Sequence, residues 1–221
     1  MTLMHLKHLA EASGGILYLM AILLLIALTV VIERSWYLYQ ALHAGQALML
    51  SLDESHTASV QSLQQLSLSY QGMPHERLLK TAIILRQEPD AEHEDARMEE
   101  SIMREIPHID RFLWMLDTIV TLAPLLGLLG TIIGMFSAFS VLADANNAPT
   151  QVTGGVAEAL IATACGLFIA ILGLVAFNGL NNRVRVIMHQ LETVKLMLLN
   201  RVKQPKRNRQ SDNEKMAAEV F

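Results

Sequence analysis

Three long stretches without charged side chains constrain the fold of this chain more than any other feature. They cover residues 14–32, residues 118–143 and about 152–182, and Glu158 is the only charge inside the third. An α-helix rises about 1.5 Å per residue, so some 20 apolar residues cross the roughly 30 Å hydrocarbon core of a bilayer. The pattern predicts three membrane-spanning helices. The first stretch is longer than the apolar region of a secretory signal, and we expect it to be retained.

Composition agrees with a membrane protein and argues against several other classes. The 221 residues are 52% hydrophobic and only 17% charged, against about 25% charged in soluble proteins. The single Cys165 has no partner for an internal disulfide, and a net charge of −4 gives no basic surface for nucleic acid.

Known motifs for catalysis or metal binding do not occur in the sequence. It contains no Walker A motif, no G-x-S-x-G and no dinucleotide fingerprint. The eight histidines are scattered, and His93 lacks the i, i+4 partner of a zinc-binding helix, so we expect solvated histidines and no metal site. The sequence therefore predicts neither an enzyme nor a cofactor.

The distribution of Lys and Arg around the apolar stretches predicts the orientation. The connection at residues 144–153 contains neither residue, whereas Arg34, Arg104, Arg111 and Arg183 flank the opposite ends of the spans. Because Lys and Arg near span ends favour the cytoplasmic side, residues 33–117 and the C-terminus are predicted to be cytoplasmic and the N-terminus to lie outside, which is the periplasm if the resemblance given below holds.

Outside the membrane, apolar residues at helical spacing predict further helices at about 59–68, 75–86 and 91–106. After the third span, apolar residues recur at alternating steps of four and three: Leu180, Val184, Ile187, Leu191, Val194 and Leu198. This heptad stripe favours a third helix that leaves the membrane unbroken and packs in a cytoplasmic bundle. The alternative is an amphipathic helix on a local core or on the membrane surface.

These observations predict an all-α integral membrane protein with cytoplasmic helical extensions. The expected parts are a periplasmic N-terminus (1–13), three transmembrane helices (14–32, 118–143 and 154–180), a cytoplasmic helical domain (33–117), a periplasmic loop (144–153), a cytoplasmic helical extension (181–203) and a disordered tail (204–221).

Small residues gather on one face of the second span and one face of the third. On the second these are Gly127, Gly130, Thr131, Gly134 and Ala138, and on the third Ala159, Ala162, Thr163, Gly166, Ala170 and Gly173. Such faces let helix backbones approach closely, because lipid supplies no hydrophobic drive for association. We expect the two faces to meet other subunits in an oligomer or a partner helix. The alternative is that they pack only on each other.

Glu158 is the candidate functional acid. A carboxylate inside a membrane is costly, so it usually faces a bundle interior and serves an ion or proton path. The alternative is a structural position near the outer interface, where a helix N-terminus favours an acid. Thr131 and Thr163 are candidates for a polar lining, although a membrane threonine often bonds a carbonyl of its own preceding turn.

Two segments of this sequence carry a family resemblance. Residues 123–135 (APLLGLLGTIIGM) and 158–167 (EALIATACGL) resemble the paired signature of the ExbB/TolQ/MotA proton-channel family, closest to its ExbB and TolQ branch. The similarity runs from about residue 100 to residue 182. One departure is Leu172 followed by Gly173, where many relatives have a proline.

The resemblance implies a subunit of an inner-membrane motor driven by the proton motive force. It implies a homopentamer that surrounds the single helices of ExbD or TolR subunits and acts on TonB or TolA. Thr131, Thr163 and Glu158 would then form the proton path. An ExbB role in transport across the outer membrane is the first hypothesis, a TolQ role in envelope integrity the second, and a passive scaffold with a structural Glu158 the third.

Overall fold

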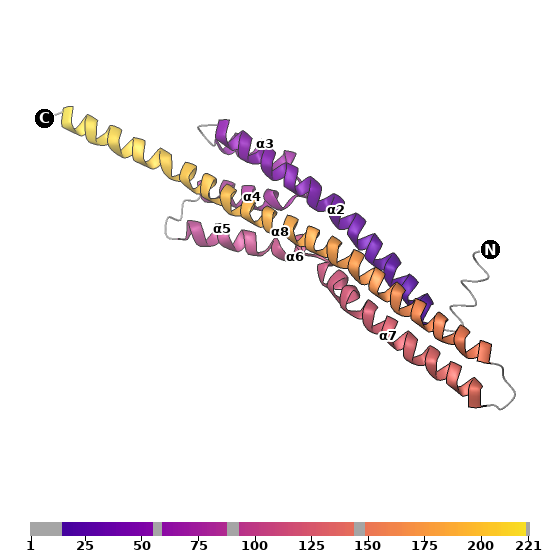
Figure 1. Ribbon diagram of the computed structural model, residues 1–221. Helices are drawn as coiled ribbons and strands as arrows, with labels where there is room; N and C mark the ends of the chain where they lie inside the picture. The colour runs from indigo at the N-terminus through magenta and orange to yellow at the C-terminus, as the bar shows by residue number, and fades with distance from the viewer. Residues whose placement is uncertain (1–14, 55–58, 88–92, 144–148, 220–221) are drawn as a thin grey trace. The chain divides into compact units, whose positions relative to one another are not determined.

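The computed structural model describes residues 15–54, 59–87, 93–143 and 149–219, and every element in this part of the chain is helical (Figure 1). The elements are α2 (Ile16–Glu54), α3 (Val60–Ser69), α4 (Pro74–Gln87), α5 (Glu94–Met103), α6 (Ile106–Ile109), α7 (Leu113–Ala143) and α8 (Pro149–Glu219). The predicted all-α class is therefore confirmed over the described residues.

Three of these helices are long and apolar enough to cross a membrane. The candidate spans are Ile16–Glu54, Leu113–Ser140 and Gly154–Arg201, and each covers most of one of the three predicted stretches. α2 continues without a break well past the predicted end of its span at residue 32. No Gly or Pro occurs between residues 16 and 44 to interrupt it. α8 is likewise one unbroken helix, as the heptad stripe predicts.

The short helices begin and end at recognisable local signals. Ser59 caps α3 by accepting a hydrogen bond from the Ser62 amide at 3.1 Å. Gly72 has a φ of +79° in the turn before α4, a conformation that glycine adopts without strain. Its amide donates to the carboxylate of Glu76 at 2.7 Å. These helices lie where the sequence predicts helices at 59–68, 75–86 and 91–106.

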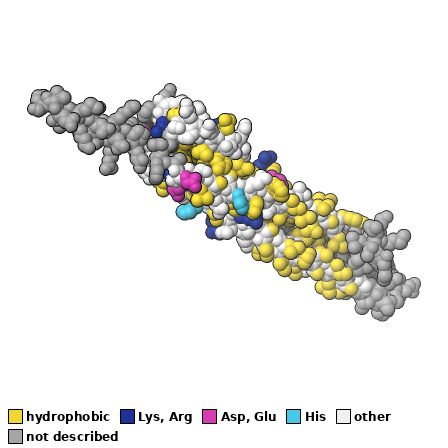
Figure 2. All heavy atoms as spheres, turned by 90° about the horizontal axis from the view of Figure 1, so that it is seen from above, with side chains coloured by type: hydrophobic (Ala, Val, Ile, Leu, Met, Phe, Trp, Pro, Cys, Tyr) yellow, Lys and Arg dark blue, Asp and Glu magenta, His cyan; other side chains and the backbone are white. Residues whose placement is uncertain are grey.

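The chain divides into two compact units. The membrane unit contains residues 1–35 and 112–181, and the helical unit contains residues 36–111 and 182–221. In the space-filling view, hydrophobic side chains gather over the membrane unit, whereas charged and histidine side chains gather over the helical unit (Figure 2). Many of the large apolar side chains of the membrane unit are exposed, among them Leu25, Leu28, Phe136, Phe168 and Ile171.

The heptad stripe of α8 forms part of the core of the helical unit. Ile187, Leu191, Val194 and Leu198 are each at most 1% exposed. Polar contacts connect α8 to its neighbours here: the Gln190 Nε2 donates to the carbonyl of Leu42 on α2, and the Lys195 ammonium contacts carboxylates of α5. α8 therefore packs in a helical bundle, as predicted. Its apolar stripe is buried in this bundle and is not available to bind a membrane surface.

The bounds of α8 include most of residues 204–221, for which the sequence predicts a disordered tail. Side chains from residue 202 onward lie outside the described residues, and the disorder of the tail stays a prediction. Of the predicted outer loop (144–153), residues 144–148 lie outside the described residues, whereas residues 149–153 belong to the first turns of α8 instead of a loop.

Candidate functional site

Helices α7 and α8 meet in the membrane unit through the small residues that the sequence singles out. All nine predicted packing residues are buried. They are Gly127, Gly130, Gly134 and Ala138 on α7, and Ala159, Ala162, Gly166, Ala170 and Gly173 on α8.

The approach of the two helices is closest at Gly166. A Cβ at this position would lie 2.5 Å from the carbonyl oxygen of Ala123 and 3.1 Å from the Cα of Gly127. Both atoms belong to the backbone of α7, which has no side-chain freedom with which to yield. Only glycine fits here without moving one helix away from the other.

The same close packing continues toward the end of α7. A Cβ on Gly130 would lie 2.8 Å from the Cβ of Ala162, and one on Gly134 would lie 2.8 Å from the Cβ of Ala159. The alanines of α8 thus pack against the glycines of α7 along the predicted faces.

Among the described residues, one hydroxyl donates a hydrogen bond across this interface. The Thr163 Oγ1 donates to the carbonyl oxygen of Gly127 at 2.9 Å, which connects α8 to α7. The Thr131 Oγ1 instead donates to the carbonyl of Leu128 in its own helix at 2.7 Å. Thr131 therefore follows the usual behaviour of a membrane threonine, whereas Thr163 adds an interhelical bond.

The two small faces thus pack on each other within one chain, which is the alternative to the expectation that they meet other subunits. The glycines and alanines of the two faces are buried in this packing, whereas Thr131 and Thr163 stay partly exposed, and contact of these faces with other subunits stays a prediction. The physical reason is that glycine and alanine faces of matching spacing let two consecutive helices approach until backbones touch.

Sequence reasoning missed three residues of this interface. Gly166 packs against the carbonyl oxygen of Ala123. A Cβ placed on Gly173 would lie 2.7 Å from the side chain of Val120, and a Cβ placed on Gly155 would lie 3.0 Å from the Cβ of Ala138. Gly155 continues the i, i+4 pattern that leads to Ala159 and could have been found. Val120 carried no such signal, because a β-branched residue does not resemble a small-residue face.

Glu158 lies in α8, four residues before Ala162 and thus about one helical turn from it. Its side chain lies outside the described residues. The role of its carboxylate is therefore taken up below as a proposal.

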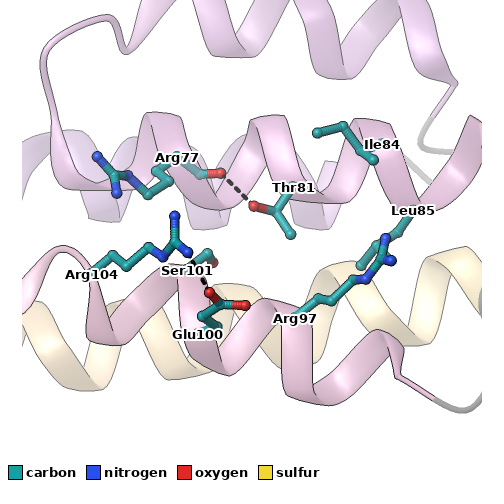
Figure 3. Close-up of a pocket in the computed structure, with 8 residues that line it drawn as sticks. All are labelled: Arg77, Thr81, Ile84, Leu85, Arg97, Glu100, Ser101 and Arg104. Atoms are coloured by element: carbon teal, nitrogen blue, oxygen red, sulfur yellow. Dashed lines mark hydrogen bonds and ion pairs between the residues drawn. The ribbon is translucent and has the colours of Figure 1, made fainter.

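In the helical unit, a cavity of about 240 Å³ lies between α4 and α5 (Figure 3). Three arginines line it, but Glu105 lies 2.6 Å from the Nε of Arg77 and Glu100 pairs with Arg104. Because these carboxylates balance much of the positive charge, the cavity is not built to take a free anion.

His75 contradicts the expectation that the histidines are solvated. Its side chain is 0% exposed, on the face of α4 that also buries Leu78 and Leu79. Among the described residues, neither of its ring nitrogens has a hydrogen-bond partner. Burial lowers the pKa of His75 to about 4. The expectation rested on the scattered positions of the histidines, but helical spacing places His75 beside Leu78 and Leu79 on the buried face of α4.

Comparison with known proteins bears on the α7–α8 pair. A sequence profile described as the MotA/TolQ/ExbB proton channel family matches residues 70–193, which includes Thr131, Glu158 and Thr163. The chain is 34% identical over 162 residues to "Putative biopolymer transport protein ExbB-like 3" of Synechocystis sp., covering 70% of this chain and 74% of that protein.

Two further relatives carry both names of the branch. "Putative biopolymer transport protein ExbB-like 1" of Synechocystis sp. is 29% identical over 172 residues, which cover 76% of this chain and 67% of the relative. "Tol-Pal system protein TolQ" of Haemophilus influenzae is 45% identical, but over 85 residues that cover 38% of this chain and 37% of the relative. The family profile and the ExbB-like relatives each match more than half of the chain, and the chain therefore belongs to the MotA/TolQ/ExbB proton channel family.

Proposed function

We propose that this chain is an ExbB-type subunit of an inner-membrane motor driven by the proton motive force. In this role it works with an ExbD-like single-span subunit and energises a TonB-like protein for transport across the outer membrane. The observation that carries the proposal is the family match over residues 70–193, because it includes the closely packed α7–α8 pair. The relatives named ExbB-like cover most of the chain, which favours this branch.

The proposed orientation places the N-terminus in the periplasm and the helical unit in the cytoplasm. Arg34, Arg104, Arg111 and Arg183 lie at the ends of the spans that this orientation assigns to the cytoplasm. A proton entering from the periplasm would therefore cross the membrane unit toward the cytoplasm.

Glu158 is the proposed proton-carrying group of this chain. A carboxylate in an apolar span has an energetic reason to exist if it exchanges a proton or an ion during function. Thr131 and Thr163 are proposed to supply polar oxygens on the path. Both already donate their hydroxyl hydrogens to backbone carbonyls. Their oxygens therefore remain as hydrogen-bond acceptors for a passing water or a protonated partner.

The energy available sets a requirement on the assembly. One charge moving through 100 mV releases about 2.3 kcal/mol, so appreciable mechanical work needs several protons in succession. A ring of identical subunits supplies equivalent sites for such a succession, and we propose a pentamer around the partner helices. Because the small faces of α7 and α8 are occupied within the chain, the contacts between subunits and with the partner would use larger exposed side chains, such as Leu128, Phe136 and Phe168.

A TolQ-type role in envelope integrity and cell division is the second candidate. The 45% identity to the Haemophilus influenzae TolQ over 85 residues favours it. Genes encoded beside this one distinguish the two: ExbD- and TonB-like neighbours support the first role, and TolR-, TolA- and TolB-like neighbours support the second.

The experiment is complementation in cells that lack the corresponding subunit, with uptake measured in the presence and absence of the proton motive force. We expect Glu158→Gln and the Thr131→Val, Thr163→Val double variant to assemble normally and to lose most uptake. Thr29→Val is the matched control, because Thr29 is an exposed threonine of α2 whose hydroxyl bonds its own helix at 2.8 Å. Full uptake by Glu158→Gln with normal assembly would leave only the passive scaffold.

A further inference from the structure

The helical unit contains a buried polar cluster that the proposed proton path does not use. It consists of His75 on α4, Gln190 on α8 and the backbone of α2 at Gly45. A Cβ placed on Gly45 would lie 2.2 Å from the Gln190 Oε1 and 2.7 Å from the His75 Nε2. Both polar atoms thus lie against the backbone of α2 at Gly45, the one residue of this helix without a side chain.

Neither of these atoms has a hydrogen-bond partner among the described residues. The other end of the Gln190 amide is engaged, since its Nε2 donates to the carbonyl of Leu42 at 3.4 Å. His75 is completely buried and Gln190 is 6% exposed. An imidazole in such a position is tolerated while it is neutral, because an uncharged ring loses far less on leaving water than a cation does.

Among the described residues, no charged side chain contributes to the pKa of His75 in a way that would stabilise an imidazolium. The only cause of its lowered pKa is burial. The nearby elements do carry titratable and charged groups, but their described interactions are with other residues. They include His43 on α2 with Tyr39 and Asp53 on α2 with Arg201; Glu76 and Arg77 on α4 with Lys80 and Glu105; Asp95, Glu99 and Glu100 on α5 with Lys195 and Arg104; and His189 and Glu192 on α8 with each other. α3 carries no charged residue.

We propose that His75 is a pH-sensitive lock, which holds α4 against α2 and α8 while neutral and releases α4 when it is protonated. Three helices meet at this residue, so expelling it separates α4 from both of its long neighbours. The proposed orientation enters this inference at one point, because it identifies the cytoplasm as the compartment whose pH His75 senses. Cytoplasmic acidification, which an uncoupled proton leak produces, would then loosen the helical unit.

The size of the response follows from linkage between protonation and opening. In the open form the ring titrates near 6.5, and in the closed form at about 4. Lowering the pH from 7.5 to 5.5 therefore raises the equilibrium constant for opening about tenfold.

Hydrogen exchange on the purified full-length protein in lipid nanodiscs tests the lock, because both faces of the membrane then meet the same buffer. Exchange of peptides from α4 is measured between pH 7.5 and 5.5 and corrected for the intrinsic pH dependence of amide exchange. We expect the corrected opening constant to rise about tenfold. We expect His75→Gln and the apolar His75→Leu to remove this rise, and His189→Gln, which changes an exposed histidine of α8, to retain it.

A flat response in the unmodified protein overturns the proposal without any variant. So does an unchanged rise in a folded His75→Leu or His75→Gln protein. The measurement needs no proton transport and no partner, so its failure is distinguishable from failure of the proposed motor function.

Discussion

Replacing Gly166 by alanine probes the packing of α7 on α8 at its tightest point. The new methyl carbon would lie 2.5 Å from the carbonyl oxygen of Ala123. Ordinary contact requires roughly 3.4 Å or more, so the helices must separate locally by about 0.9 Å. A shift of this size stretches the 2.9 Å bond from Thr163 to Gly127 past the roughly 3.5 Å at which it ceases to be a hydrogen bond.

The expected change in the free energy of unfolding combines two destabilising effects and one stabilising effect. Overpacking costs about 1–3 kcal/mol, and an interhelical hydrogen bond in a membrane contributes about 0.6–1.7 kcal/mol. Alanine returns roughly 1 kcal/mol through its better helix propensity. Gly166→Ala should therefore lower the free energy of unfolding by about 1–4 kcal/mol.

The assay is reversible unfolding of the detergent-solubilised protein with increasing mole fraction of SDS, followed by circular dichroism. Gly179→Ala is the matched control, because a Cβ at Gly179 of α8 meets nothing within 4 Å. It gains the same helix propensity without a clash and should be neutral or stabilising.

A second variant tests the coupling to the hydrogen bond. Thr163→Val alone should cost about 0.6–1.7 kcal/mol, and it should cost little in the Gly166→Ala background, where the bond is already broken. If Gly166→Ala is as stable as Gly179→Ala, or if the two effects simply add, the packing described for α7 and α8 is wrong.

Three further predictions concern the helical unit and use the same unfolding assay. The pKa of His75 is lowered to about 4 in the folded protein, so the unfolded chain binds more protons than the folded chain below pH 6.5. The free energy of unfolding should therefore fall by up to about 3 kcal/mol between pH 6.5 and 4. An equal fall in the His75→Leu variant would contradict this prediction. Lys195→Met should destabilise by about 1 kcal/mol, because this 12% exposed ammonium contacts two carboxylates of α5 at 2.6 and 3.0 Å. Arg104→Met, which removes an exposed pair, should cost less, and the reverse order would refute the assignment. Gly45→Ala should cost about 1–3 kcal/mol through its clash with Gln190 and His75. Adding Gln190→Ala should recover part of that loss, since the closest atom is the end of a side chain, and no recovery would count against the geometry.

The sequence was sufficient to predict the membrane-spanning helices and the small-residue faces of α7 and α8. Apolar length identified the spans, and the spacing of Gly127, Gly130 and Gly134 identified the packing face, because both signals are local and periodic. Which helix packs on that face could not be predicted from local periodicity. A small-residue face fits the next helix of the same chain and a helix of another subunit equally well, and only the structure shows that Ala159 and Ala162 fill it.

The buried state of His75 was beyond a residue-by-residue reading for a related reason. Its burial depends on α2 and α8, whose positions 45 and 190 are far from it in the sequence. Gly45 removes the side chain that would otherwise occupy the space. The heptad stripe of α8 did predict which face of that helix is buried, since it needed only periodicity along one helix.

Proton flux through the assembled complex is the measurement on which the proposed function depends. The chain would be reconstituted into liposomes with an ExbD-like single-span subunit, and internal pH would be followed after imposing a membrane potential. We expect potential-driven proton uptake with the unmodified chain, and a loss of at least tenfold with Glu158→Gln at equal assembly. Equal flux through the two complexes, or no flux above empty liposomes with the unmodified one, would contradict the proposal.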